Sequence, residues 1–104
     1  MSKYLLAFHG GGMPETAEDQ ARVMAAWGDW FGRLGEAVAD PGNPTTASRT
    51  ISPDGRVSVD GSPSISGYTV ISADSFDAAV AAAKDCPVLA SGASIEVLET
   101  TEVM

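Results

Sequence analysis

His9 is the only histidine in this chain of 104 residues, and its imidazole is the side chain best suited to acid–base chemistry. Imidazole changes its charge near neutral pH, so a histidine beside a ligand can act as a general base there. The run Gly10-Gly11-Gly12 follows directly, and glycine lets a ligand or a partner come close to the backbone. The alternative is a histidine that ends a strand and hydrogen-bonds to the backbone. We therefore predict His9 as the first candidate catalytic residue.

Cys86 is a poor nucleophile, since it follows a predicted helix whose C-terminal dipole raises the pKa of a thiol.

Several other chemistries find no support in the sequence. The glycine run is not followed by the lysine of a phosphate-binding loop, and the carboxylates of Glu15, Glu18 and Asp19 would repel phosphate. No base stands beside Ser64 or Ser66 to make a hydrolytic triad. One histidine and one cysteine exclude a histidine-rich metal site, whereas carboxylate sites for hard metals stay open but have no recognisable spacing here. The sequence therefore predicts neither a metal nor a cofactor.

Aromatic residues are the candidates for a hydrophobic pocket. Trp27 and Trp30 belong to an apolar stripe at helical spacing that runs from Val23 to Leu34. Such a stripe packs into the core, and the same face can line a pocket between a helix and a sheet. We predict that Trp27, Trp30 and Tyr68 line a cleft of ligand size.

Composition limits the classes of partner. The formal net charge is −8, from 14 acidic residues against 6 Lys and Arg. An acidic surface repels nucleic-acid phosphates and anionic membranes, so neither is predicted as a partner. A single cysteine excludes an internal disulfide, and no apolar run is long enough to span a membrane. We expect a cytoplasmic protein.

Hydrophobic periodicity and turn residues predict one α+β domain over residues 1–104. A strand over 3–9 precedes a helix that begins at Pro14 or at a Thr16 cap and stops at Gly35. The remaining predictions are a short strand over 36–40, a hairpin of 46–51 with 56–59 around the turn 52–55, a loop over 60–63, a strand over 66–73, a helix from Phe76 to Cys86-Pro87 and a strand over 93–100. The second helix is expected to bury Phe76, Ala79, Val80 and Ala83.

The order and spacing of several motifs resemble the YCII-related (DGPF-type) family along nearly the whole chain. The motifs are Tyr4-Leu5-Leu6, Trp27-x-x-Trp30-Phe31-x-x-Leu34-Gly35, Asp40-Pro41-Gly42-x-Pro44, Asp60-Gly61-x-Pro63, Gly67-Tyr68-x-Val70-Ile71-x-Ala73-Asp74-Ser75-Phe76-Asp77-x-Ala79 and Ser94-Ile95-Glu96-Val97. Asp85 matches the aspartate of a His/Asp pair in the better-studied branch of the superfamily, so the resemblance makes Asp85 the second candidate catalytic residue. The first helix here has no histidine, and Met24 or Trp27 falls near the position of that pair's histidine. A working pair requires the His9 imidazole to lie within hydrogen-bonding reach of the Asp85 carboxylate, directly or through one water. The alternative is an exposed carboxylate, or one that bonds its own loop.

The resemblance implies a ferredoxin-like βαββαβ unit with an added hairpin, paired into a dimeric α/β barrel. It implies a homodimer that binds an unknown small molecule, with weak or lost enzymatic activity. One alternative is a protein-interaction module, because DGPF-type domains can accompany alternative sigma factors in bacteria. Another is an enzyme of the lyase or cofactor-free monooxygenase type. A closed, dry core with an exposed apolar patch would favour the interaction module.

Overall fold

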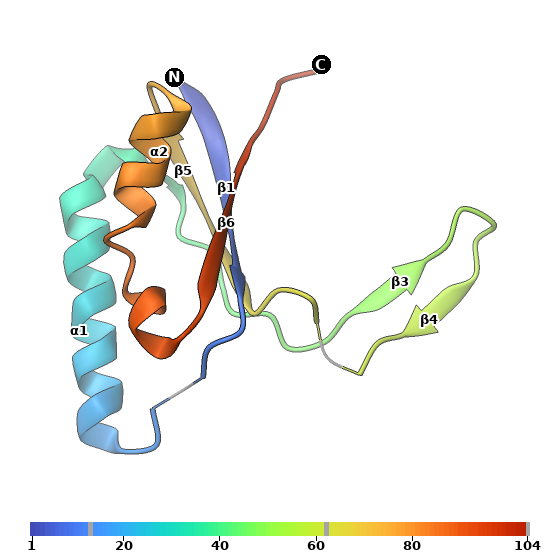
Figure 1. Ribbon diagram of the computed structural model, residues 1–104, viewed down its shortest axis with the longest axis horizontal. Coiled ribbons are helices and arrows are strands. Elements are labelled where there is room, and N and C mark those ends of the chain that lie inside the picture. Colours follow the sequence, from blue (N-terminus) through green and yellow to red (C-terminus); the bar gives the residue numbers. More distant parts are fainter. Residues whose placement is uncertain (13, 62, 104) are drawn as a thin grey trace.

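Two helices pack on one side of a four-stranded antiparallel sheet, and a separate pair of strands projects from the other side (Figure 1). The computed structural model describes residues 1–12, 14–61 and 63–103. The elements in chain order are β1 (Ser2–His9), α1 (Ala17–Leu34), the 3₁₀ turn η1 (Gly35–Ala37), β2 (Val38–Asp40), β3 (Arg49–Ile51), β4 (Val57–Val59), β5 (Gly67–Ala73), α2 (Phe76–Ala83), the 3₁₀ turn η2 (Pro87–Ser91) and β6 (Ser94–Glu99).

The sheet has the strand order β2-β5-β1-β6, so the first strand lies inside and the last strand lies beside it at an edge. This order, with one helix after β1 and one after β5, is compatible with a ferredoxin-like α+β fold. Every pairing in the sheet is antiparallel. The predicted α+β class is confirmed at this level.

Side-chain caps fix where the helices begin. The Thr16 hydroxyl accepts the backbone N–H of Asp19 at 3.1 Å, and the Ser75 hydroxyl accepts that of Ala78 at 3.1 Å. Gly35 ends α1 with a φ of +56°, a conformation that glycine adopts without strain. Thr16, rather than Pro14, therefore caps the first helix.

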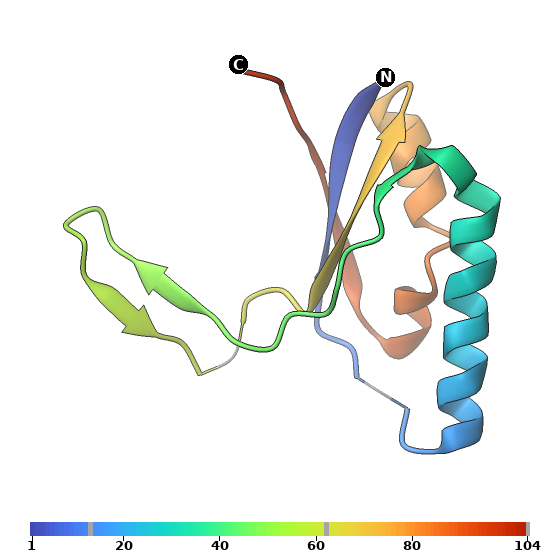
Figure 2. The ribbon, with the colours of Figure 1, turned by 180° about the vertical axis from the view of Figure 1, so that it is seen from behind.

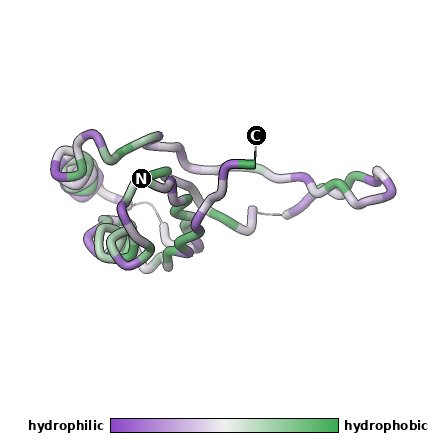
Figure 3. The backbone as a smooth tube through the Cα atoms, turned by 90° about the horizontal axis from the view of Figure 1, so that it is seen from above, coloured by the Kyte–Doolittle hydropathy of each residue, from purple (hydrophilic) through white to green (hydrophobic). Residues whose placement is uncertain are grey.

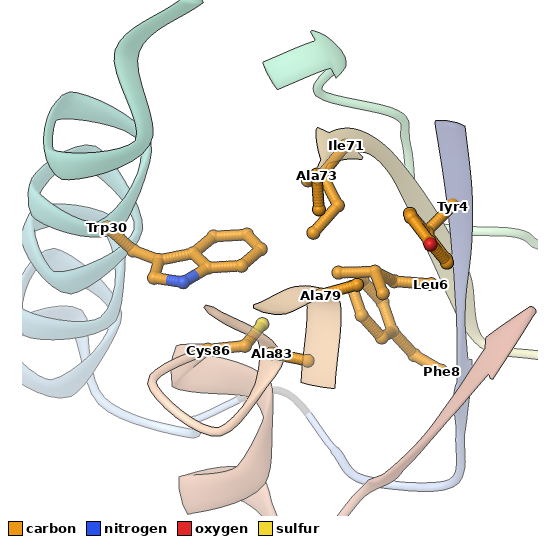
Figure 4. Packing of buried hydrophobic residues seen from close by; sticks show 9 residues of the cluster. All are labelled: Tyr4, Leu6, Phe8, Trp30, Ile71, Ala73, Ala79, Ala83 and Cys86. Carbon is orange, nitrogen blue, oxygen red and sulfur yellow. The ribbon is translucent and has the colours of Figure 1, made fainter. Parts of the chain in front are cut away.

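The core lies between the helices and the sheet, and side chains from β1, β5 and both helices meet in it (Figure 4). Its buried members are Tyr4, Leu6, Phe8, Trp30, Ile71, Ala73, Ala79, Ala83 and Cys86. Thr69 is also buried, and its hydroxyl donates to the carbonyl of Pro41 at 2.9 Å. Alternate residues of β1 and β5 supply this face, as the two-residue period of a strand requires.

The other side of the sheet, which we call the open face, carries no helix (Figure 2). The register places Leu5 opposite Val70 on one side and Leu98 on the other, and it places Ala7 between Tyr68 and Glu96. Directly paired residues point to the same face, so these side chains and His9 share the open face. Leu5 and Val70 are partly buried, whereas Leu98 is exposed.

Strands β3 and β4, with the turn between them, form an arm of residues 49–59 that extends away from the sheet (Figure 3). Backbone hydrogen bonds join the base of the arm to β5 and to the residue before it. The Thr45 N–H donates to the Ser66 carbonyl at 3.0 Å, and the Tyr68 N–H donates to the Asn43 carbonyl at 3.3 Å. Gly42 has a φ of +75°, and a Cβ there would lie 1.7 Å from the Tyr68 carbonyl oxygen. Only glycine fits this crossing.

Several predicted elements differ from those observed. The strand expected over 36–40 is shortened to β2, because η1 takes up the residues that follow Gly35. The turn η2 was not predicted. Phe76 is exposed rather than buried, since it begins α2 at the edge of the core, where its ring makes a T-shaped contact with Tyr4 at a centroid distance of 5.5 Å. Ser62, in the loop predicted over 60–63, lies outside the described residues.

Candidate functional site

His9 ends β1 on the open face, where both nitrogens of its ring have partners. Nδ1 lies 2.9 Å from the carbonyl oxygen of Ser64, and Nε2 lies 3.0 Å from Oε1 of Glu96. Glu96 lies on β6, where it pairs with Ala7 of β1. It is therefore the diagonal neighbour of His9 across the two strands. Ser64 belongs to the segment that leads from the arm back to β5. The histidine thus joins three separate parts of the chain.

Both partners of the ring are hydrogen-bond acceptors, and this favours its protonated form. A neutral imidazole has one N–H, so it can satisfy only one acceptor, whereas an imidazolium donates to both. The pKa of His9 is accordingly raised, chiefly by the hydrogen bond to Glu96, then by the Ser64 carbonyl, with partial burial acting in the opposite direction. A protonated ring is the wrong form for a general base. It is suited instead to holding Glu96 or to donating a proton.

The His9–Glu96 pair stands at one end of a stripe of apolar side chains on the open face. Ala7 lies between Tyr68 and Glu96, and in the next row Leu5 lies between Val70 and Leu98, with Asp40 paired to Val70 at the edge of the sheet. The Tyr68 hydroxyl makes no hydrogen bond within the part of the chain that the structure describes. The open face therefore combines a short apolar surface with a phenol, a carboxylate and an imidazole at one end, and with Lys3 and Ser72 at the other.

The glycine run after His9 serves the packing of the chain. Gly11 has a φ of +82°, and a Cβ there would lie 2.6 Å from the Ser91 hydroxyl and 3.0 Å from the Ala93 side chain. Glycine is needed at Gly11 so that the loop can pass close to the turn before β6. Nothing lies within 4 Å of the corresponding positions at Gly10 and Gly12.

Asp85 lies on the helix side of the sheet, away from His9. It borders an open groove of about 360 Å³ between α1 and η2, together with Asp29 and two arginines. One of them, Arg22, already pairs with Asp19 at 3.3 Å. The structure does not bring Asp85 to His9, whose carboxylate partner is Glu96.

The three aromatic residues predicted to line one cleft are divided between the two sides of the sheet. Trp30 is only 1% exposed, and its indole N–H donates to the carbonyl of Ala82 at 3.0 Å. Trp27 is partly buried and packs against Phe8, Trp30 and Phe31, with ring centroids 5.6–5.8 Å apart. Tyr68 points to the open face. The tryptophans fill the space in which a cleft between sheet and helices was predicted.

The remaining candidates carry no chemistry. A second, shallow groove of about 140 Å³ lies between α2, η2 and β6 and has mostly apolar walls. Burial raises the pKa of the Cys86 thiol to about 11, so the thiolate is scarce at neutral pH. Among the described residues, no group of three or more His, Cys, Asp or Glu side chains is placed to hold a metal ion.

Glu96 is the site residue that the sequence did not reveal. The alternation of Ile95 and Val97 with their neighbours does place Glu96 on the face opposite the core. What links it to His9 is the pairing of β1 with β6, which joins residues 87 positions apart in the chain. The resemblance to a known family therefore pointed to Asp85 rather than to Glu96.

Comparisons with known proteins add no family to this picture. No helix in the described ranges is both long and apolar enough to cross a bilayer. The chain matches no model of a known protein family, and a search of curated proteins likewise returns no match.

Proposed function

We propose that this protein is a homodimer, assembled through the open face of its sheet, that binds a small and largely apolar molecule beside His9 and Glu96. The observation that carries the proposal is the composition of the open face. Its aliphatic row of Leu5, Val70 and Leu98 ends at a cluster of three polar groups. An antiparallel sheet in a monomer usually turns a polar face to water, so aliphatic residues there indicate a surface that becomes covered.

A second copy is the simplest cover for such a surface. Two open faces related by a twofold axis would place aliphatic rows against each other, as in sheet-on-sheet packing at a spacing of about 10 Å. The polar ends would then border the interface instead of lying in its centre. The two grooves found among the described residues are open, so we expect the dimer to close the ligand site.

The polar groups suggest the chemistry of the ligand. The Tyr68 hydroxyl can donate or accept a hydrogen bond, and the second oxygen of Glu96 can accept one. The apolar part of the ligand would lie beside Ala7 and Tyr68, next to the aliphatic row that the second copy covers. Because two acceptors favour the protonated form of His9, the ring is a poor general base, and we favour binding over turnover.

Family membership is a separate part of the proposal. The strand order is compatible with the ferredoxin-like unit that the YCII-related resemblance implies, and the motifs occur in the family's order. We propose that the chain is a divergent member, with the dimeric α/β barrel as its assembly. Asp85 would keep its motif position without its partner.

Sedimentation velocity combined with native mass spectrometry tests the proposal. We expect twice the chain mass at micromolar concentration and a copurifying small molecule on the dimer. Binding of anilinonaphthalene sulfonate, as an apolar probe, should weaken in Tyr68→Phe, which removes one hydroxyl from the open face. The matched control is Tyr4→Phe, whose hydroxyl donates to Glu99 on the helix side at 3.1 Å. A monomer, or a dimer that binds neither ligand nor probe, would contradict the proposal.

A second candidate function is a protein-interaction module that regulates another protein, including a sigma-factor-linked role in bacteria. The closed core and the exposed arm favour it, because the tryptophans leave no cleft between sheet and helices. A dimer that carries no small molecule but retains a specific protein partner in pull-down experiments would favour this second function.

A further inference from the structure

The arm has one polar and one apolar face. Ser58 pairs with Thr50, and Asp60 accepts the hydroxyls of Ser48 and Thr50 at 2.8 and 3.0 Å, so the polar face satisfies itself. On the opposite face the register places Val57 beside Ile51 and Val59 beside Arg49. Exposure there is 70% for Ile51, 57% for Val57 and 74% for Val59.

Such an arm lacks the packing that stabilises a hairpin. A two-stranded ribbon is marginally stable in water unless its apolar face packs on something. No element of the same chain covers this face within the described ranges, since all three aliphatic residues are exposed. The chain has a radius of gyration of 15.3 Å, whereas a domain of this length usually has about 13 Å. The difference reflects the projecting arm.

The direction of the arm indicates where its partner lies. Both side views show the arm leaving the body on the side opposite the helices, which is the side of the open face (Figures 1 and 2). The hydrogen bonds at Thr45 and Tyr68 tie the base of the arm to β5. A molecule that packs on the open face therefore lies next to the arm.

Charge favours a second copy as that molecule. The arm holds two arginines, Arg49 and Arg56, and one aspartate, Asp54, whereas the other 93 residues hold 13 of the 14 acidic side chains and only four basic ones. Arg49 stands on the apolar face beside Val59. The weakly basic arm of one copy thus complements the acidic body of another, while the net charge of −8 disfavours contact between two bodies alone.

We infer that the arm of each chain docks, through Ile51, Val57 and Val59, on the body of a second copy that lies against its open face. In a twofold dimer the two arms embrace the partner reciprocally. This inference rests on the proposed homodimer and adds the segment that stabilises it.

A pair of neighbouring variants on β4 tests the inference. Val59→Glu places a carboxylate on the apolar face of the arm, and Ser58→Glu places the same charge on the polar face. By sedimentation equilibrium we expect Val59→Glu to raise the dimer dissociation constant about tenfold or more, and Ser58→Glu to change it less than about twofold. Both positions are exposed, so circular dichroism should show native folds for both variants.

The outcomes separate the two proposals. Equal dissociation constants in wild type, Val59→Glu and Ser58→Glu would overturn the role of the arm while leaving the homodimer intact. A wild-type monomer would overturn both.

Tryptic cleavage gives an independent measurement on the wild-type protein. The arm contains two cleavage sites, after Arg49 and Arg56, which docking would shield. At fixed trypsin concentration, the rate constant for cleavage in the arm should fall as protein concentration rises through the dimer dissociation constant. A rate constant that stays the same while the dimer forms would overturn the inference and leave the arm to a different protein partner.

Discussion

The two sides of the sheet differ in how completely a single chain covers them. On the helix side, β1 and β5 bury Tyr4, Leu6, Thr69 and Ile71, and Trp30 fills the space beneath α1. On the open face the same two strands leave Leu5 and Val70 partly exposed, and the arm beyond them exposes three aliphatic residues. The helix side forms a buried core, whereas the open face and the arm expose aliphatic side chains that we propose a second copy covers.

The comparison is informative because both sides come from the same strands. Neighbouring residues of β1, β5 and β6 differ in environment solely through the direction in which they point. A substitution on the helix side should therefore change the free energy of unfolding of the monomer. A substitution on the open face should mainly change association.

The largest expected effect is at Trp30. Trp30→Ala should lower the free energy of unfolding by about 3–5 kcal/mol, because it leaves a cavity in the core and removes the hydrogen bond from the indole N–H to the Ala82 carbonyl. Urea unfolding followed by circular dichroism measures this value. Trp27→Ala, at a partly buried position, should cost about 1–3 kcal/mol. Equal losses for the two variants would contradict the assignment of Trp30 to the core and Trp27 to its margin.

Gly42 tests whether the base of the arm is as rigid as its hydrogen bonds indicate. Gly42→Ala should cost about 2–4 kcal/mol, since it combines a positive φ with a collision against the Tyr68 carbonyl. Gly55, in the turn at the tip of the arm, is the control. It has a φ of +88° and nothing within 4 Å of the position of a Cβ, so Gly55→Ala should cost about 1 kcal/mol. Thermal and urea unfolding measure both variants. If Gly42→Ala and Gly55→Ala lowered the free energy of unfolding by the same amount, the crossing at Gly42 would not be constrained.

Two adjacent residues of β6 compare the faces most directly. Val97 packs against the core, and Val97→Ala should cost about 1–2 kcal/mol of monomer stability. Leu98 points to the open face, and Leu98→Ala should cost less than about 0.5 kcal/mol at protein concentrations where the wild type is monomeric. In the proposed dimer, Leu98→Ala should instead raise the dissociation constant that sedimentation measures. Reversed effects at the two positions would invalidate the division of the sheet into a core face and an association face.

The smallest expected effect is a pH dependence from His9. Its pKa is raised above the value of about 6.5 that it has in an unfolded chain, so the folded state binds the proton more tightly. The resulting stabilisation is fully present below that unfolded value and is lost as pH rises through the higher folded value. Since His9 is the only histidine, its ring proton signal in NMR can be assigned without ambiguity.

Glu96→Gln is the variant that tests the cause of this shift. Removing the carboxylate charge should lower the NMR midpoint of His9 toward about 6.5 and flatten the stability profile above that pH. Glu99→Gln, which alters a carboxylate of the same strand that bonds Tyr4, is the control. An unchanged midpoint in Glu96→Gln would show that another group holds the His9 proton.

The sequence determined the local features of this protein. The Thr16 and Ser75 caps, the stop at Gly35, the turn 52–55 and the alternation within β5 and β6 each depend on residues close together in the chain. Their physical causes are equally local, namely backbone hydrogen bonds, allowed φ values and the direction of successive side chains. The element order and the α+β class could therefore be predicted.

Tertiary structure alone decided which distant groups meet. The pairing of β1 with β6 gave His9 the partner Glu96, and the sheet between them separated His9 from Asp85. Packing of α1 placed Trp30 in the core, left Trp27 at its margin and closed the cleft that the aromatic stripe had suggested. These outcomes depend on strand order and on helix rotation. Both are set by the burial of the apolar surface of the whole chain, so no short stretch of sequence predicts them.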